Sequence, residues 1–158
     1  MKFTNEYTKM SILLIINPVS GNGPQEKIFN LFEQYSKRLN FSYNIYETTK
    51  HQDRQNISKL LEEDNYDKVI VAGGDGTINI VGSLLVNTNT KLGIIPIGSA
   101  NGLARELGIP EEPAEALKIA MDNNVRSIDA IHLGKDDYFF HLSDFGLNAR
   151  VVKRFEKS

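Results

Sequence analysis

The residues best suited to chemistry stand where an apolar, β-branched run stops. Gly73 and Gly74 are followed by Asp75, Gly76 and Thr77. Because glycine has no Cβ, an anion can approach the main chain closely at such a turn, where a following helix presents free N–H groups. A threonine hydroxyl there can cap the helix or bind a phosphate oxygen, and a carboxylate can hold a cation or accept a proton. The segment therefore predicts phosphoryl-group chemistry; a glycine-rich capping turn without a ligand is the alternative.

Two further polar, glycine-bearing loops follow apolar runs in the same way. The segment 17–21 follows the run 12–16, and the segment 96–107 follows the run 92–95. If all three runs are parallel strands, their loops meet at one edge of the sheet, where open α/β sheets bind their ligands. The three loops therefore predict one shared site.

The order of the elements predicts an α/β fold with an open, doubly wound, mostly parallel sheet and a C-terminal β-hairpin. Apolar runs alternate with segments of helical periodicity, which favours parallel strands covered by helices. The expected strands are Ser11–Ile16, Ser42–Glu47, 68–72 and 91–95, and the expected helices are 24–39, 52–63, a helix after Thr77, 100–107 and a last one ending at Met121. The expected tail has extended runs at 127–133 and 138–143, joined by a turn at 134–137, and a closing helix at 150–157.

Composition limits the function classes. A chain of 158 residues with 41% hydrophobic and 24% charged residues suits one globular domain, here 11–158 after a polar N-terminal segment at 1–10. A net charge of −2 gives no general attraction to nucleic acid. The chain has no cysteine, no signal-peptide pattern and no apolar run that could span a bilayer, so we expect a cytoplasmic protein. His51, His132 and His141 are too scattered to predict a metal cluster.

The chain resembles the catalytic domain of the diacylglycerol kinase and sphingosine kinase family, which shares a superfamily with the NAD kinases. The matching segments run in the family's order and are 17–21, 73–79, 98–105 and, more weakly, 145–149. Three positions depart from common family patterns: Ile80 stands where a glutamate is frequent, Gly102 where an aspartate is frequent and Asn148 where bacterial relatives often have aspartate. These departures bear on the acceptor rather than on the nucleotide site.

The resemblance implies ATP-dependent phosphorylation of a hydroxyl on a lipid such as diacylglycerol or a sphingoid base, with Mg²⁺. It implies that Asp75 acts at the catalytic centre, either as a Mg²⁺ ligand or by orienting the reacting groups. The residues expected to bind the nucleotide are Asn17, Pro18, Val19, Ser20, Gly21, Thr48, Gly73, Gly74, Asp75, Gly76, Thr77, Ile78, Asn79, Ser99 and Asn101.

The resemblance also implies a lipid partner bound through a second, β-rich domain that supplies the lipid pocket and the general base. We expect these 158 residues alone to lack that domain, to bind ATP weakly if at all and to transfer no phosphate to lipid. Asp144 is a second candidate carboxylate, with a strand-end position as the simpler interpretation. A peripheral contact with the inner membrane face is a further expectation.

Other interpretations compete with parts of this one. Gly21 and Gly23 begin like a dinucleotide-binding fingerprint, and Glu47 could bind a ribose, but Glu26 replaces the third glycine and Pro24 removes an N–H donor. An NAD-kinase-like or NAD-dependent domain and a non-catalytic nucleotide-binding regulatory domain are the alternative functions. The residue Arg105 is either a phosphate ligand or a surface charge paired to Glu106 or Glu111.

Overall fold

The computed structural model describes residues 10–18, 25–132 and 138–140. Within them, one sheet of four parallel strands has the order β2-β1-β3-β4. The strands are β1 (Ser11–Ile16), β2 (Ser42–Glu47), β3 (Lys68–Gly73) and β4 (Lys91–Pro96). The helices are α1 (Gln25–Leu39), α2 (Asp53–Glu63), α3 (Asp75–Leu85), α4 (Gly102–Glu106) and α5 (Pro113–Met121).

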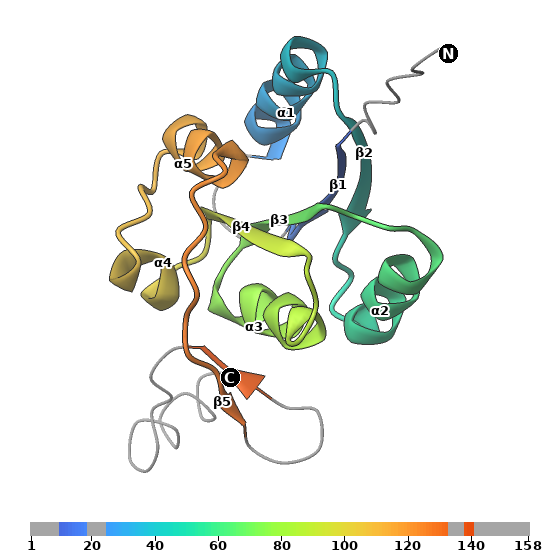
Figure 1. Cartoon of the computed structure of the whole chain (residues 1–158). Helices are drawn as coiled ribbons and strands as arrows, with labels where there is room; N and C mark the ends of the chain where they lie inside the picture. The colour runs from blue at the N-terminus through green and yellow to red at the C-terminus, as the bar shows by residue number, and fades with distance from the viewer. Residues whose placement is uncertain (1–9, 19–24, 133–137, 141–158) are drawn as a thin grey trace, which may run out of the picture.

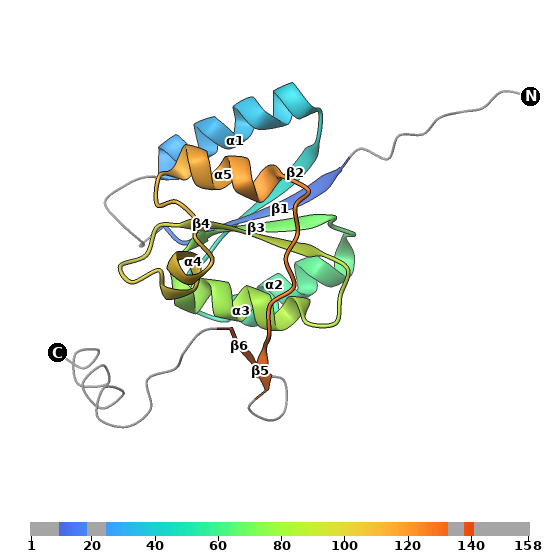
Figure 2. The same cartoon turned by 60° about the vertical axis from the view of Figure 1, so that its left-hand side comes forward.

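Helices cover both faces of this sheet. Figures 1 and 2 show α1 and α5 on one face, with α2 and α3 on the other. Consecutive strand residues face opposite sides, so a strand covered on both faces needs an unbroken apolar run. In β1, Ile12 and Leu14 pack toward α1 and α5, whereas Leu13 and Ile15 pack toward α2 and α3. The predicted doubly wound, parallel fold is confirmed.

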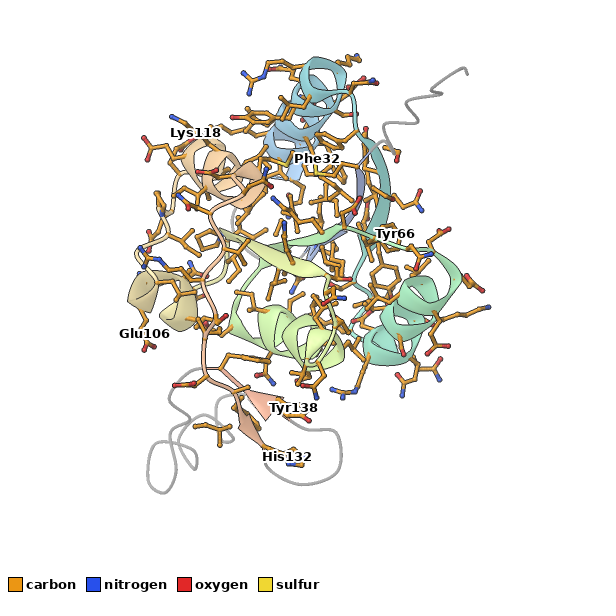
Figure 3. The ribbon with its side chains drawn as sticks, viewed as in Figure 1. Phe32, Tyr66, Glu106, Lys118, His132 and Tyr138 are labelled. Carbon is orange, nitrogen blue, oxygen red and sulfur yellow. The ribbon has the colours of Figure 1, made fainter. Side chains whose placement is uncertain are left out.

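Each face of the sheet has its own hydrophobic core, and large side chains from different elements pack in the two cores. Figure 3 shows Phe32 between α1 and the sheet, and Tyr66 beside α2 on the opposite face. The Phe32 ring meets the rings of Phe41 and Tyr43 edge-on, with centroids 5.4 and 5.2 Å away. Such aromatic pairs add stability beyond the area they bury.

The strands end together at one edge of the sheet, which we call the carboxyl edge. Ile16 pairs with Glu47 and Ala72, and Gly73 pairs with Pro96. The hydrogen-bonded ladder continues one residue further, because the N–H of Asn17 donates to Ala72 and the N–H of Thr48 donates to Ile16, both at 2.9 Å. The loops after β1, β2, β3 and β4 therefore begin side by side.

The C-terminal hairpin predicted from the sequence is confirmed, with shorter strands among the described residues. β5 (Ile131–His132) pairs antiparallel with β6 (Tyr138–Phe139), whereas residues 127–130 of the expected run are not part of a strand. The preceding residues are exposed and lie outside both sheets, and an extended run without a hydrogen-bonding partner is not a strand. The hairpin lies against α3 (Figure 2), where a Cβ on Gly82 would come within 2.7 Å of the Phe140 ring. The turn 134–137 and the helix 150–157 lie outside the described residues.

Candidate functional site

The first turn of α3 holds the segment in which the sequence predicted phosphate chemistry. The helix begins at Asp75, with Gly74 as its N-cap, and its first hydrogen bond runs from the Ile78 N–H to the Gly74 carbonyl at 3.1 Å. The N–H groups at 75–77 consequently have no partner within the helix, which is the arrangement that attracts anions. The helix starts earlier than the predicted start after Thr77, so Thr77 is not its cap.

The glycines of this loop serve two different purposes. A Cβ on Gly98 would come within 2.5 Å of the Gly74 Cα, and a Cβ on Gly73 would come within 2.9 Å of the Thr77 Cβ. The glycine at 98 therefore lets the loops after β3 and β4 pack closely, whereas Gly73 leaves room for the Thr77 side chain that follows it on α3. Gly76 is different, because it is exposed and a Cβ there would meet nothing within 4 Å. Gly76 leaves open space at the helix N-terminus, where a phosphate can reach the main chain.

Asp75 joins this turn to the loop after β4. Its Oδ2 accepts a hydrogen bond from the Gly102 N–H at 2.9 Å, and its Oδ1 accepts one from the Leu103 N–H at 3.1 Å. Both donors belong to the first turn of α4, so the carboxylate satisfies N–H groups that the helix itself cannot. The geometry gives Asp75 an orienting role between the two loops, and its direct part in catalysis stays a prediction.

The loop after β4 is also closed by its own asparagine. Asn101 Oδ1 accepts from the Gly98 N–H, and its Nδ2 donates to the Gly98 carbonyl, both at 2.9 Å. Asn101 is buried with a left-handed φ of 51°, which asparagine tolerates better than most residues. Its amide therefore shapes the loop, while Ser99 is exposed. Direct contacts from Ser99 and Asn101 to a nucleotide remain predictions.

The loop after β1 reaches toward α3. Asn17 Nδ2 donates to Thr77 Oγ1 at 3.4 Å, and Pro18 is exposed, with its carbonyl accepting from Gln25 Nε2 at 2.6 Å. The predicted ligands Val19, Ser20 and Gly21 lie outside the described residues. On α3, the Ile78 side chain is buried in the core and Asn79 is half-buried.

Thr48 contributes a buried hydroxyl to the same edge. The residue is 8% exposed and follows β2, next to the end of β1. In the part of the chain that the structure describes, the Thr48 Oγ1 is the one buried side-chain polar atom without a hydrogen-bond partner. Buried polar groups are rarely left unpaired, so this atom is a natural contact for a ligand.

Asp53, which no sequence motif singled out, organises the loop after Thr48. Its buried carboxylate accepts hydrogen bonds from the main-chain N–H groups of Thr49 and Lys50 and from the Tyr46 hydroxyl. Burial raises the pKa of Asp53, but the hydrogen bonds from Thr49, Tyr46 and Lys50 together outweigh burial and hold the pKa below its ordinary value. Burial also raises the pKa of Tyr46. The sequence signal was an aspartate at the start of a helical pattern, directly after a polar loop.

Arg105 and two of the histidines, His51 and His132, lie at the surface. Arg105 forms an exposed ion pair with Glu111, with its Nη2 2.8 Å from the Glu111 Oε1. The surface interpretation of Arg105 is therefore the one that the structure bears out. His51 lies exposed in the loop before α2, and His132 stacks on the Tyr138 ring in the hairpin, with centroids 4.8 Å apart. His141 and Asp144 lie outside the described residues.

These residues fit a nucleotide better than a metal held by protein alone. The open space at Gly76, the free N–H groups of α3 and the unpaired Thr48 hydroxyl suit phosphate and hydroxyl groups. No group of three or more His, Cys, Asp or Glu side chains among the described residues could hold a metal ion. Mg²⁺ commonly binds through substrate phosphates and few protein ligands, so it would enter this site with the nucleotide.

Comparison with known proteins finds similarity to lipid kinases. A family model of the diacylglycerol kinase catalytic domain matches residues 11–133. A "Probable lipid kinase YegS-like" of Chromohalobacter salexigens is 44% identical over 104 residues, covering 63% of this chain and 33% of that protein. The "Probable lipid kinase YegS" of Escherichia coli O1:K1 is 39% identical over 88 residues, covering 53% of this chain and 29% of that protein.

Solved structures of diacylglycerol kinases have a similar fold. The crystal structure of a diacylglycerol kinase from Bacillus anthracis str. Sterne matches with a TM-score of 0.66 and 28% identity, covering 78% of this chain and 47% of that chain. The matches therefore span less than half of each of these three relatives. The family model covers most of this chain. The chain therefore belongs to the diacylglycerol kinase catalytic domain family.

Proposed function

We propose that the chain is the nucleotide-binding part of an ATP-dependent lipid kinase. The observation that carries the proposal is the carboxyl edge of the sheet. There an exposed glycine in the first turn of α3 follows β3, and the Thr48 hydroxyl, unpaired among the described residues, follows β2; these are the two strands that flank β1. Family membership supports phosphoryl transfer to an alcohol, and the names of the matched proteins support a lipid acceptor. The acceptor would be a hydroxyl of diacylglycerol or of a sphingoid-type lipid.

Different residues would bind the phosphates, bind the rest of the nucleotide and orient the loops. The N–H groups at 75–77 and those of Val19, Ser20 and Gly21 would hold the phosphates, since the Asn17 N–H is bound to Ala72 and Pro18 has none. Thr48 would hydrogen-bond to the nucleotide. Asp75 would keep the loops after β3 and β4 in register, so that the phosphates are held in one orientation for transfer. Mg²⁺ bound with ATP would neutralise phosphate charge during transfer.

The variant Gly76→Ala tests the phosphate site. Alanine favours a helix over glycine by about 0.5–1 kcal/mol, and its Cβ meets no protein atom, so the fold should be as stable or more stable. The same Cβ would occupy space that the phosphate needs. Calorimetric titration with ATP–Mg²⁺ should show at least a tenfold loss of affinity, since each tenfold is about 1.4 kcal/mol. Lys118→Ala, an exposed change on α5, is the control.

Thermal unfolding with each ligand separates ATP from NAD. A ligand that binds only the folded state raises the melting temperature, so ATP–Mg²⁺ should raise it and NAD should not. A shift with NAD alone would support the dinucleotide alternative. Unchanged ATP affinity in Gly76→Ala would show that the phosphates lie elsewhere.

The acceptor needs a separate measurement. None of the described helices combines the length and apolarity that crossing a bilayer requires, so lipid would be met at a membrane surface. Labelled ATP with mixed micelles of diacylglycerol, ceramide and sphingosine tests transfer by these 158 residues, and we expect none. Robust, Asp75-dependent labelling of one lipid would instead locate the acceptor site within this chain.

A further inference from the structure

The loop between β2 and α2 is held in an unusual shape by Asp53. Within this loop, Lys50 and Gln52 both have left-handed φ values, 67° and 55°. Residues other than glycine adopt this conformation at a cost, and they keep it only where their surroundings enforce it. Two such residues in one short loop indicate a shape that is maintained against local strain.

The bonds that enforce this shape all lead to the Asp53 carboxylate. The Thr49 N–H donates to Oδ1 at 2.8 Å, and the Lys50 N–H donates to Oδ2 at 2.9 Å. The Tyr46 hydroxyl donates to Oδ1 at 2.8 Å, which adds a bond from β2 itself. Hydrogen bonds to an ionised carboxylate are among the stronger ones in proteins.

These bonds stabilise the loop rather than the helix. Gln52 is the N-cap of α2 and makes no side-chain capping bond, and the first helical bond runs from the Asn56 N–H to the Gln52 carbonyl. The main-chain donors to Asp53, in contrast, precede it in the chain. The carboxylate therefore folds the end of the loop back onto its beginning.

The beginning of the loop is Thr48. Its N–H is fixed to the Ile16 carbonyl at 2.9 Å, and its Oγ1 is buried without a hydrogen-bond partner among the residues that the structure describes. Thr49, the next residue, is bound to Asp53 through both its N–H and its hydroxyl. The position of the Thr48 side chain is thus set on one side by the sheet and on the other by Asp53.

We infer that Asp53 is a positioning residue for nucleotide binding, which holds the loop at 48–52 so that the Thr48 hydroxyl is presented to the nucleotide. This inference rests on the proposed function, because it takes ATP as the ligand at the carboxyl edge. It adds a residue that acts only through Thr48 and through the shape of its loop.

A double-mutant cycle tests whether Asp53 acts through Thr48. ATP–Mg²⁺ affinity is measured by calorimetry for the full chain and for Asp53→Asn, Thr48→Val and the double variant. Each single change should weaken binding about tenfold, and the double variant should be no weaker than the weaker single variant. Independent losses that multiply to about a hundredfold would overturn the inference, as would unchanged affinity in Asp53→Asn.

Two further variants separate positioning from folding. Asp64→Asn is the matched control. Like Asp53, Asp64 accepts a hydrogen bond from a tyrosine hydroxyl; its second bond comes from an asparagine amide, and it lies at the other end of α2. Its ATP affinity should stay within twofold of the parent. If Asp53→Asn does not fold, Tyr46→Phe removes a single bond to the same carboxylate and should show the same coupling to Thr48→Val. Absence of ATP binding both by the parent chain and by a longer, catalytically active form would reject the proposed function and this inference together, whereas additive variants would reject the inference alone.

Discussion

The two edges of the same sheet differ in whether their buried polar groups are hydrogen-bonded. At the amino edge, where the strands begin, Lys68 is only 3% exposed, yet its Nζ donates to the carbonyls of Ala120 and Asp122 at 2.5 and 3.1 Å. There the Ser11 N–H also donates to the Asp67 carboxylate at 2.8 Å. At the carboxyl edge, the Thr48 hydroxyl is buried without a partner among the described residues.

This difference separates stability from function. Folding favours the pairing of each buried polar group, and the amino edge follows that rule even for a lysine. Lys68 also places its charge at the C-terminal end of α5, where the helix dipole favours a cation. An unpaired hydroxyl and an open helix N-terminus at the other edge are explained when a ligand completes them.

The largest expected effect breaks the amino edge. Lys68→Ala removes two bonds from a charged donor and leaves carbonyls of α5 without their partner, so the free energy of unfolding should fall by about 3 kcal/mol. Urea unfolding measures the loss, and the affinity for ATP–Mg²⁺ should stay within about twofold because the nucleotide lies at the opposite edge. Lys91→Ala is the matched control, since Lys91 pairs with Lys68 in the sheet but is exposed. Weak ATP binding by a folded Lys68→Ala would show that the two edges are not independent.

Changing Asp75 should affect stability and turnover together. Asp75→Asn keeps one acceptor oxygen but loses the charge that holds the N–H groups of Gly102 and Leu103, so we expect a loss of about 1–2 kcal/mol in unfolding free energy. In a catalytically active, longer form of the protein, turnover should fall on the order of 10²-fold, because the phosphates lose their fixed orientation. Normal turnover in that variant would reduce Asp75 to a loop-closing residue.

The change Thr48→Val should have effects of opposite sign on stability and binding. Valine has nearly the same shape and removes a hydroxyl that is buried without a partner, so the free energy of unfolding without ligand should rise by about 1 kcal/mol. Thermal unfolding with and without ATP–Mg²⁺ measures both properties in one experiment. A loss of stability in the ligand-free protein would mean that the hydroxyl already has a partner and that the two edges are alike.

The sheet was predictable from the sequence, whereas the contacts between its loops were not. Strands β1 and β2 have their predicted bounds, because a strand in a covered sheet needs a long apolar or alternating run that is visible in the chain. The glycine segment at the start of α3 was also found, since its residue types are rare in combination. Its main structural contact was not, because Asp75 bonds to residues 27 and 28 positions away, and no local pattern specifies such a pair.

The same lack of a local signal for distant contacts applies to Gly74 and to the C-terminal hairpin. Gly74 was expected to make room for phosphate, which stays a prediction, and the structure adds that it makes room for Gly98. The substitution Gly74→Val would therefore disturb the loops before it tested ligand binding. The predicted hairpin is present, but among its described residues the extended run at 127–133 is paired only at Ile131–His132, since an extended pattern does not show how far a partner strand reaches.

The smallest expected effect concerns Asp53 and acid. Its pKa in the folded protein lies below the ordinary value, because hydrogen bonds from Thr49, Tyr46 and Lys50 outweigh the effect of burial. The folded state therefore binds fewer protons than the unfolded state, and the stabilising contribution is complete above the ordinary carboxylate pKa of about 4. It is lost as the pH falls from about 5 through that value toward the lower pKa of the folded protein. Urea unfolding of the parent and of Asp53→Asn between about pH 6 and pH 3 measures this contribution as the difference between the two stability curves. The curves should converge as the pH falls, because protonation removes from the parent the charge that the variant already lacks. Curves that remain parallel would mean that the carboxylate keeps its proton equilibrium on folding, and the loop after β2 would then owe its shape to other bonds.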